Sequence, residues 1–519
     1  MATAKNARTR RSGHRIAVVG GGMAAARLVQ QLAAYGDALD VTVIGEEPHL
    51  PYNRVLLADV LAGRYSPDVV ALPTPPSAAR WLRGVRAVRI DRAAGEVLCD
   101  GGQCVPYDSL VLATGSNPVL PPLRGLFEPD SHDLPQGVHA FRTMDDCLAL
   151  ATAVRPGVRT VVIGGGLLGV SAARALARRG AQVVLAQQGE HLMERQLDAG
   201  ASQLLRQHVE ALGVEVHTEC RVRGLLTGPT EETEPTGPAE PAGAAETGSG
   251  SVRGSVRTVT AVELADGFRL DAELIVLACG VRPRVGLAQA AGLTVKRGIV
   301  VDDELRTSDP RIHAIGDCAE HDGVLYGLAG PAQEQADVLA RLLAGPAPDA
   351  HDAPGFQAGA ARTAPDGTGP GIHAGPDHTA HTAPVPAAHA AHSPDAHAAP
   401  APDAPTAPAP DVQTAPAQGR SYTGTRSLTR LTLTGSVPGQ PLDLAAFGEI
   451  DPSPGDDVVH LSDATRGAYR KVVVRGDRLI GGILLGDLGT VGALARTWEG
   501  DEPLPSAPLL HLLTNDGGS

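Results

Sequence analysis

The sequence predicts an α/β fold of two similar units, followed by a small α+β unit and interrupted by long disordered inserts. Three observations support this prediction. A strand, a glycine-rich loop and a helix occur twice, beginning at Ile16 and at Thr160. Each copy continues with a second strand and short antiparallel strands, and closes with an apolar strand. The stretches 228–257 and 345–420 contain few large apolar residues, so neither can offset the entropy of ordering.

The elements of both copies are predicted from apolar runs bounded by turn residues. In the first copy we expect a strand at 16–19, a loop at 20–25, a helix to about residue 34, strands at 41–44, 85–90 and 96–99, and a closing segment at 110–115. In the second copy we expect a strand at 160–163, a loop at 164–169, a helix to about residue 179, strands at 182–186, 214–217, 221–226 and 259–264, and a closing segment at 274–280. The insert at 228–257 separates two of these strands, where a hairpin tip can lengthen at small entropic cost.

The two glycine loops predict phosphate binding. Each follows a strand and opens a helix, which is the context that gives a G-x-G-x-x-G pattern meaning. The first glycine allows a tight turn, the second lets the backbone approach a pyrophosphate, and the third position must be small. The residues concerned are Gly20, Gly22, Met23, Ala25, Gly164, Gly166, Leu168 and Gly169. Two such loops, unless both are ordinary tight turns, indicate two Rossmann-like dinucleotide-binding domains of the three-layer ββα type.

The second strand of the first copy leads to Glu46, where a carboxylate can accept hydrogen bonds from ribose hydroxyls. A solvated loop acid is the alternative. In the second copy the matching turn at 186–189 has no acid, and Glu190 comes slightly later. No arginine stands there to bind a 2′-phosphate, so the sequence leaves the choice between NADH and NADPH open.

The net charge is -14, of which -5 lies in 228–252 and -6 in 345–419. The rest of the chain is nearly neutral, which argues against nucleic acid as a partner. No uninterrupted apolar run reaches membrane-spanning length, and the basic residues 1–13 lack the apolar core of a signal peptide. We therefore expect a flexible tail at 1–13, no membrane partner and a cytoplasmic location.

The six cysteines form no C-x-x-C pair, which argues against structural zinc and iron–sulfur sites. Cys99 and Cys104 have the spacing of a flavin-enzyme dithiol, but the Asp-Gly-Gly at 100–102 predicts a hairpin turn between them. We expect structural cysteines. The histidines of the linker could form a metal-binding tract, but they have no fixed spacing, so we expect a solvated linker and no metal site.

A further signal is the pair Gly316-Asp317 after an apolar strand and before an apolar helix at 332–343. In flavoproteins with two dinucleotide domains, such an aspartate holds the ribityl chain of FAD, and the following helix directs its N-terminus at the flavin. Capping the next helix is the alternative for Asp317. Arg54, within 51–57, is a candidate contact of the FAD phosphates or the flavin edge, with a surface position as its alternative.

Together these features resemble the pyridine-nucleotide-dependent flavoprotein reductases that include ferredoxin and rubredoxin reductases, and more closely the flavoprotein portion of assimilatory nitrate and nitrite reductases. The likeness covers 14–344 and, weakly, 421–515. It is carried by 45–63, FRTMDD (141–146), 161–176, HLMERQLD (191–198) and 297–340. The resemblance implies FAD contacts at Gly20, Gly22, Ala25, Glu46, Thr114, Gly115 and Asp317, nicotinamide-nucleotide contacts at Gly164, Gly166 and Gly169, and Glu334 and Gln335 near the helix that faces the flavin. Met23, Arg54, Leu168 and Gly280 complete the candidate cofactor-binding residues.

The resemblance also implies a division into domains. An FAD-binding domain would comprise 14–122 and 284–344, and an NAD(P)-binding domain 123–283 with its insert at 228–257. The linker 345–420 would lead to a C-terminal interface domain at 421–515. In that domain we expect strands at 427–433, 458–461, 470–474 and 479–485, and a helix at 488–497.

We therefore expect an FAD-dependent NAD(P)H oxidoreductase without an obligatory catalytic side chain. It would pass a hydride from NAD(P)H to FAD and electrons to a redox acceptor protein, an assimilatory nitrate or nitrite reductase. Nitrite-reducing relatives continue into a cysteine-rich iron–sulfur module and a sirohaem domain that these 519 residues lack. The alternatives are a ferredoxin or rubredoxin reductase and a non-catalytic FAD-binding scaffold protein. A homodimer is a further candidate assembly.

Overall fold

The computed structural model describes residues 13–35, 39–74, 79–128, 133–229, 257–345, 421–433, 442–463, 465–486, 488–500, 503–504 and 513. Almost all of the predicted tail at 1–13, insert at 228–257 and linker at 345–420 lies outside these residues. Among the described helices, none combines the length and the apolar character needed to cross a lipid bilayer.

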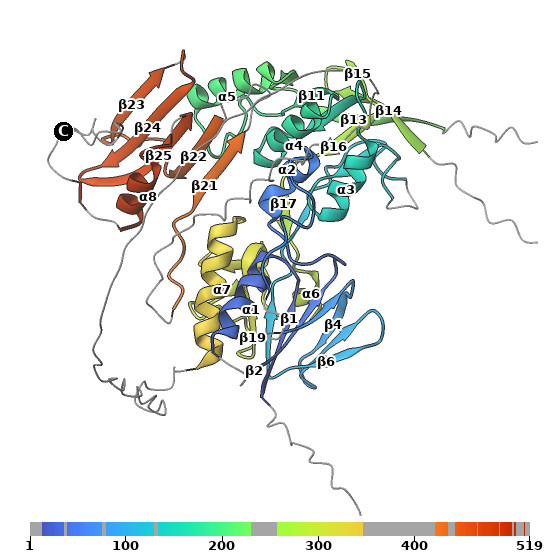
Figure 1. Cartoon of the computed structure of the whole chain (residues 1–519), viewed down its shortest axis with the longest axis vertical. Coiled ribbons are helices and arrows are strands. Elements are labelled where there is room, and N and C mark those ends of the chain that lie inside the picture. Colours follow the sequence, from blue (N-terminus) through green and yellow to red (C-terminus); the bar gives the residue numbers. More distant parts are fainter. Residues whose placement is uncertain are drawn as a thin grey trace, which may run out of the picture. The chain divides into compact units, whose positions relative to one another are not determined.

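The first unit is built around a five-stranded parallel sheet in the order β19-β7-β1-β2-β3. These strands are β1 (His14–Val19), β2 (Leu39–Gly45), β3 (Arg80–Arg83), β7 (Ser109–Leu112) and β19 (Ile312–Ala314). Helices α1 (Met23–Ala33) and α7 (Ala329–Ala344) pack side by side on this sheet (Figure 1). A small antiparallel sheet of β4 (Ala87–Asp91), β5 (Glu96–Cys99) and β6 (Cys104–Pro106) completes the third layer.

The second unit repeats this plan with a parallel sheet in the order β12-β11-β10-β16-β9. Its strands are β9 (Val138–Ala140), β10 (Arg159–Ile163), β11 (Gln182–Ala186), β12 (Val214–His217) and β16 (Leu274–Leu277). Its main helices are α3 (Met144–Ala153), α4 (Leu167–Arg178) and α5 (Ala199–Ala211). Its antiparallel sheet comprises β13 (Val222–Pro229), β14 (Arg257–Leu264) and β15 (Arg269–Asp271).

The boundaries predicted for the insert at 228–257 need a correction. Strand β13 continues to Pro229 and pairs there with Arg257, the first residue of β14. The ends of that range are therefore strand, because the two arms of the hairpin keep their ladder of hydrogen bonds up to the residues that bound the insert.

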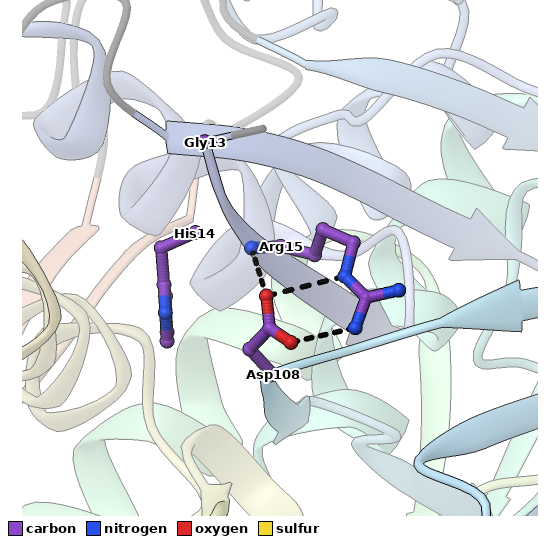
Figure 2. Close-up of a pocket in the computed structure, with 4 residues that line it drawn as sticks. All are labelled: Gly13, His14, Arg15 and Asp108. Carbon is purple, nitrogen blue, oxygen red and sulfur yellow. Dashed lines mark hydrogen bonds and ion pairs between the residues drawn. The ribbon is translucent and has the colours of Figure 1, made fainter. Parts of the chain in front are cut away.

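Each of the two units has an arginine–carboxylate contact of its own at the amino ends of its first and closing strands. The backbone N–H and the guanidinium of Arg15 donate to Asp108 at 2.9, 3.1 and 2.6 Å (Figure 2). In the second unit Arg159 donates to Glu273 from its backbone N–H at 3.3 Å and from Nε at 3.4 Å. The shallow pocket drawn in Figure 2 lies at this end of β1. Since ligands bind at the carboxyl ends of such strands, we assign the pocket a structural role.

The C-terminal unit is an antiparallel sheet in the order β21-β22-β25-β24-β23, with helix α8 (Val491–Gly500) packed against it. Its strands are β21 (Leu428–Leu433), β22 (Leu442–Gly448), β23 (Asp457–Asp463), β24 (Ala468–Arg475) and β25 (Arg478–Gly486). The sequence prediction lacked β22, because LDLAAFG is poor in β-branched residues and has little polar alternation. The predicted fold class, two Rossmann-like units and a small C-terminal unit, is confirmed.

The C-terminal unit contacts both preceding units. Tyr422 is 1% exposed within the core of the first unit, and its N–H donates to the carbonyl of Asp303 at 2.6 Å. Asp198, which begins α5, accepts hydrogen bonds from Tyr469 at 2.7 Å and from Lys471 at 2.8 Å. The two contacts fix the C-terminal sheet to separate elements of the chain.

Short elements connect the units and complete the fold. They are η1 (Arg54–Leu56), α2 (Leu57–Leu61), β8 (Ser116–Pro118), β17 (Val281–Pro283), α6 (Gly286–Ala290), β18 (Ile299–Val301), η2 (Gly316–Cys318) and β20 (Ala319–His321). Strands β8 and β17 pair antiparallel at the junction of the first two units. Every residue of β7 and β16 is buried, as expected for central strands of parallel sheets covered on both faces.

Candidate functional site

Both glycine loops close against their sheets through the same backbone hydrogen bond. The N–H of Gly20 donates to the carbonyl of Ile44 at 2.8 Å, and the N–H of Gly164 donates to that of Ala186 at 2.8 Å. Both glycines have positive φ angles, +117° and +112°. A built Cβ would lie 2.0 Å from a carbonyl oxygen at Gly20 and 2.5 Å from one at Gly164, in each case that of an alanine in the closing segment. Only glycine fits at these two positions.

The second glycine of each loop precedes a helix without a side-chain cap. Gly22 is the N-cap of α1 and Gly166 is the N-cap of α4. Among the described residues, no atom lies within 4 Å of a Cβ built on either glycine. Uncapped backbone N–H groups and open space therefore occur together, which fits the pyrophosphate of a dinucleotide in both units.

The third small position differs between the loops. Ala25 is 0% exposed and accommodates its methyl group within the first unit. A Cβ built on Gly169 would lie only 1.7 Å from the carbonyl oxygen of Gly164. Helix α4 thus approaches its loop more closely than α1 does, and the second unit requires glycine there.

Asp317 lies in η2, at the carboxyl end of β19. Its Oδ2 accepts hydrogen bonds from the Ser116 hydroxyl at 2.8 Å and from the Arg142 guanidinium at 2.5 Å. Asp317 does not cap the next long helix, because Leu328 is the N-cap of α7. The preceding Gly316 donates its N–H to the buried side-chain oxygen of Gln335 at 2.7 Å, which fixes the turn.

Arg142 was not among the predicted site residues, although it lies in the FRTMDD segment. Burial lowers the pKa of the Arg142 guanidinium, and Asp317 opposes this effect. Its Nε atom is buried and has no hydrogen-bond partner among the described residues. An unpartnered donor beside Asp317 fits a site that a polar cofactor completes.

Glu46, Thr114 and Gly115 are brought together by Arg284, which sequence reasoning also missed. The guanidinium of Arg284 donates to Glu46 at 2.6 Å. Its backbone N–H donates to the carbonyl of Gly115 at 2.9 Å, and its own carbonyl accepts the Thr114 hydroxyl at 2.7 Å. Glu46 is thus paired at the surface rather than simply solvated. No motif surrounding Arg284 could have revealed this contact.

Arg54 is part-buried, so the surface alternative is wrong. Its guanidinium donates to Glu47 at 2.8 Å and to the carbonyl of Arg142 at 2.5 Å. Burial alone would raise the pKa of Glu47, but Arg54 and the hydroxyl of Tyr52 hold it below its usual value. Arg54 therefore stabilises the position of the segment that contains Arg142.

The remaining predicted residues lie at helix starts and turns. Met23 is the first residue of α1, and Leu168 is the second residue of α4. Gly280 has a φ of +94° and open space beside it among the described residues. Glu334, in α7, accepts a hydrogen bond from the Thr425 hydroxyl at 2.6 Å, so its contact is with the C-terminal unit.

The cysteines lack the features of a redox dithiol. Cys99 and Cys104 lie on β5 and β6, which pair as an antiparallel hairpin, as predicted. Burial raises the pKa of Cys99, which disfavours the nucleophilic thiolate. All six cysteines are free thiols, and Cys318 is fully buried.

Comparison with known proteins identifies the family. Residues 14–336 match the pyridine nucleotide-disulphide oxidoreductase family, and residues 440–497 match the rubredoxin NAD+ reductase C-terminal domain. The chain belongs to the pyridine nucleotide-disulphide oxidoreductases. This membership confirms the predicted resemblance and the predicted class, an FAD-dependent NAD(P)H oxidoreductase with FAD and NAD(P)H as its cofactors.

Two curated relatives each match about two thirds of the chain. A nitrite reductase [NAD(P)H] of Bacillus subtilis is 35% identical over 335 residues, which cover 64% of this chain and 37% of that protein. An assimilatory nitrate reductase electron transfer subunit of the same organism is 33% identical over 336 residues, covering 64% of this chain and 39% of that protein. The chain thus spans about two fifths of the length of these relatives.

Solved structures share the whole architecture. The putidaredoxin reductase–putidaredoxin complex has a TM-score of 0.67 with this chain at 20% identity, covering 98% of this chain and 99% of that chain. NADH:rubredoxin oxidoreductase from Clostridium acetobutylicum has a TM-score of 0.60 at 18% identity, with coverage of 97% and 100%. At these identities the similarity establishes the fold.

Proposed function

We propose that the chain transfers a hydride from NAD(P)H to FAD and passes electrons to a separate acceptor protein. The observation that carries the proposal is the pair of equivalent loops, in which Gly22 and Gly166 each leave open space at an uncapped helix N-terminus. A bound nicotinamide nucleotide supplies the hydride, and a bound flavin accepts it and can release single electrons.

In this proposal the first unit, 14–122 with 284–344, holds FAD. The loop and the start of α1 bind the pyrophosphate, and Glu46 accepts hydrogen bonds from the adenosine ribose. Asp317 accepts hydrogen bonds from the ribityl hydroxyls. Its 2.5 Å ion pair with Arg142 orients the carboxylate.

The second unit, 123–283, holds NAD(P)H. Gly166 and Leu168 bring backbone N–H groups of α4 to the pyrophosphate, while Gly169 permits the close approach of helix and loop. Gly280 offers open space at the carboxyl end of β16. The protein binds the nicotinamide and the flavin and orients them relative to each other. Such positioning of two reacting groups supplies much of the rate enhancement.

No side chain of the described site needs to act as a nucleophile. The raised pKa of Cys99 and the complete burial of Cys318 support electron transfer without thiol chemistry. The free state of all six cysteines also favours a reducing compartment, and we therefore propose a cytoplasmic location that cell fractionation would test.

For the acceptor we propose an assimilatory nitrate or nitrite reductase, on the basis of the sequence identity to the two Bacillus subtilis proteins. A ferredoxin or rubredoxin as acceptor is the second candidate, because residues 440–497 match the rubredoxin reductase C-terminal domain. A homodimer of the chain is compatible with either acceptor.

Anaerobic stopped-flow measurement of flavin absorbance tests the proposal. NADH or NADPH should bleach the yellow protein, and the acceptor should restore its colour. Faster reoxidation by ferredoxin or rubredoxin than by nitrate or nitrite reductase would select the second candidate. A protein that binds FAD but is not reduced by either nucleotide would be a non-catalytic FAD-binding scaffold.

A further inference from the structure

The turn after β11 lies where a Rossmann-like unit contacts the adenosine ribose of its dinucleotide. Side chains in this turn decide whether the site accepts a ribose hydroxyl or a 2′-phosphate. In the first unit the equivalent turn supplies Glu46, directly after β2. In the second unit the residue directly after β11 is Gln187.

Gln187 is committed to the glycine loop. Its Oε1 accepts the N–H of Gly165 at 2.7 Å. Its backbone N–H donates to His217 at 2.8 Å, and its carbonyl accepts the N–H of Cys220 at 2.8 Å. Its Cβ lies 2.9 Å from a Cβ built on Gly165. Gln187 is therefore fixed against the loop and brings no charge to the turn.

The chain then folds back over the same loop. Leu192 and Met193 are 0% and 1% exposed, and the N–H of Met193 donates to the carbonyl of Gly165 at 2.9 Å. Met193 has a φ of +54°, in the left-handed region that residues other than glycine rarely adopt. Such a conformation persists only where the surroundings fix it, and it often marks a functional segment.

The reversal at Met193 returns the next side chain to the turn. A Cβ built on Gly189 would lie 2.0 Å from Oε1 and 2.3 Å from Oε2 of Glu194. Glu194 Oε1 also accepts the N–H of His191 at 3.2 Å. The carboxylate of Glu194 thus occupies the space that a side chain at residue 189 would fill.

Two further acidic residues belong to this turn or contact it through the backbone. Glu190 follows Gly189, and the N–H of Glu219 donates to the carbonyl of Gly189 at 2.8 Å. The Nε2 atom of His191 lies 3.9 Å from a carboxylate oxygen of Glu190. A 2′-phosphate beside Gly189 would meet the carboxylate of Glu194, and like charges in proximity disfavour binding.

We infer that Glu194 is the specificity-determining residue that makes the second unit select NADH over NADPH. Its carboxylate accepts hydrogen bonds from the adenosine ribose hydroxyls and repels a 2′-phosphate. No acidic residue stands directly after β11, where Gln187 lies. Glu194, seven residues later, provides the carboxylate because the turn at Met193 directs the chain back. This assignment rests on the proposed function and specifies NADH as its electron donor.

Titration calorimetry of NAD+ and NADP+ binding to the FAD-loaded full chain tests the assignment. Wild-type protein should bind NAD+ about 10-fold or more tighter than NADP+. Glu194→Gln should weaken NAD+ binding by about 10-fold and reduce the preference, since it removes a charge-assisted hydrogen bond. The matched control Glu190→Gln, on the same exposed turn, should change both constants by less than about 2-fold.

A second variant removes the carboxylate from its position without removing its charge. The methyl group of Gly189→Ala would displace the Glu194 carboxylate, so NAD+ binding should again weaken. Flavin absorbance and the melting temperature establish that each variant is folded. An unchanged NAD+/NADP+ ratio in Glu194→Gln, or a wild-type preference for NADP+, would overturn the assignment. Failure of wild-type protein to bind either nucleotide would instead contradict the proposed function.

Discussion

The two dinucleotide-binding units have the same backbone plan and differ in the side chains that complete it. In both, the first glycine of the loop donates to the end of the second strand at 2.8 Å. In the first unit Glu46 stands directly after that strand and is paired with Arg284. In the second unit Gln187 binds the loop, and the carboxylate of Glu194, seven residues later, lies against Gly189 in the turn.

This difference separates two kinds of constraint. A Cβ at the first glycine of each loop, or at Gly169, would strike a carbonyl oxygen, so these positions tolerate little change. In the proposed function, the carboxylate that binds the ribose needs only to reach the end of the second strand, so different segments of the chain can supply it. The glycine pattern is therefore shared by both units, whereas the polar residues belong to each unit separately.

The largest effect on stability should come from substituting the third small residue of a loop, Gly169 in the second unit or Ala25 in the first. Gly169→Ala places a Cβ 1.7 Å from the carbonyl oxygen of Gly164 and should destabilise the second unit by roughly 1–3 kcal/mol or more, with loss of nicotinamide-nucleotide binding. Ala25→Gly should cost only about 0.5–1 kcal/mol. Denaturant unfolding and nucleotide titration measure both variants, and equal costs would show that the two helices approach their loops alike.

The next effect concerns Asp317. The residues predicted for the second unit include no equivalent aspartate. Asp317→Asn removes the 2.5 Å ion pair with Arg142 and should weaken FAD binding by about 10- to 100-fold. Asp337→Asn is the matched control, because it removes the 2.6 Å ion pair with Arg27 between α1 and α7. Flavin fluorescence during dialysis reports the affinity. A similar loss of FAD in both variants would make Asp317 a general stabilising residue.

A smaller effect should distinguish the contacts of the C-terminal unit. Tyr469→Phe removes a 2.7 Å hydrogen bond to Asp198, at the start of α5 in the second unit. It should lower the free energy of unfolding by about 1 kcal/mol and leave FAD binding unchanged. Chemical denaturation and the FAD content of purified protein check the two parts. Loss of FAD would mean that this contact also supports the first unit.

The smallest effect concerns the clamp at the amino ends of the strands (Figure 2). Hydrogen bonds from Arg15 lower the pKa of Asp108 to about 2. Since this folded-state pKa lies below the unfolded value of about 3.9, the stabilisation is present above that value and is lost as the pH falls towards 2. Both side chains are more than one third exposed, so we expect only a small contribution to the free energy of unfolding.

Urea unfolding of wild type and Asp108→Asn between pH 7 and pH 2 measures this contribution. The two stabilities should converge as the pH falls below about 4. Glu273→Gln, at the equivalent position of the second unit, should have a comparable effect, because Glu273 accepts a hydrogen bond from Arg155 at 2.5 Å in addition to the longer ones from Arg159. A difference that persists at pH 2 would show that the clamp does not act through the charge of Asp108.

The sequence was sufficient to predict the elements that repeat. Strands such as 182–186 and 96–99 agree with β11 and β5 because apolar runs end at clear turn residues. Strand β22 was missed because LDLAAFG carries no such pattern. The antiparallel pairing at the C-terminal sheet, rather than local preference, stabilises that strand.

The candidate site was predictable only where backbone geometry dictates the residue. The glycines of both loops could be proposed from the sequence because a tight turn and a helix start each favour a residue without a side chain. Arg142 and Arg284 were missed because their partners, Asp317 and Glu46, lie far away in the sequence. Glu194 was missed because its approach to Gly189 depends on the left-handed turn at Met193. Contacts across so many residues leave no periodic signal in the sequence.

The most direct test of the account is the nucleotide content of two matched loop variants. Gly22→Val and Gly166→Val each fill the open space over the second glycine of one loop. After reconstitution with FAD, Gly22→Val should lack flavin, whereas Gly166→Val should retain about one FAD per chain and fail to bind NAD+. Retention of FAD by Gly22→Val, or its loss from a folded Gly166→Val protein, would contradict the division of the two cofactors between the two units.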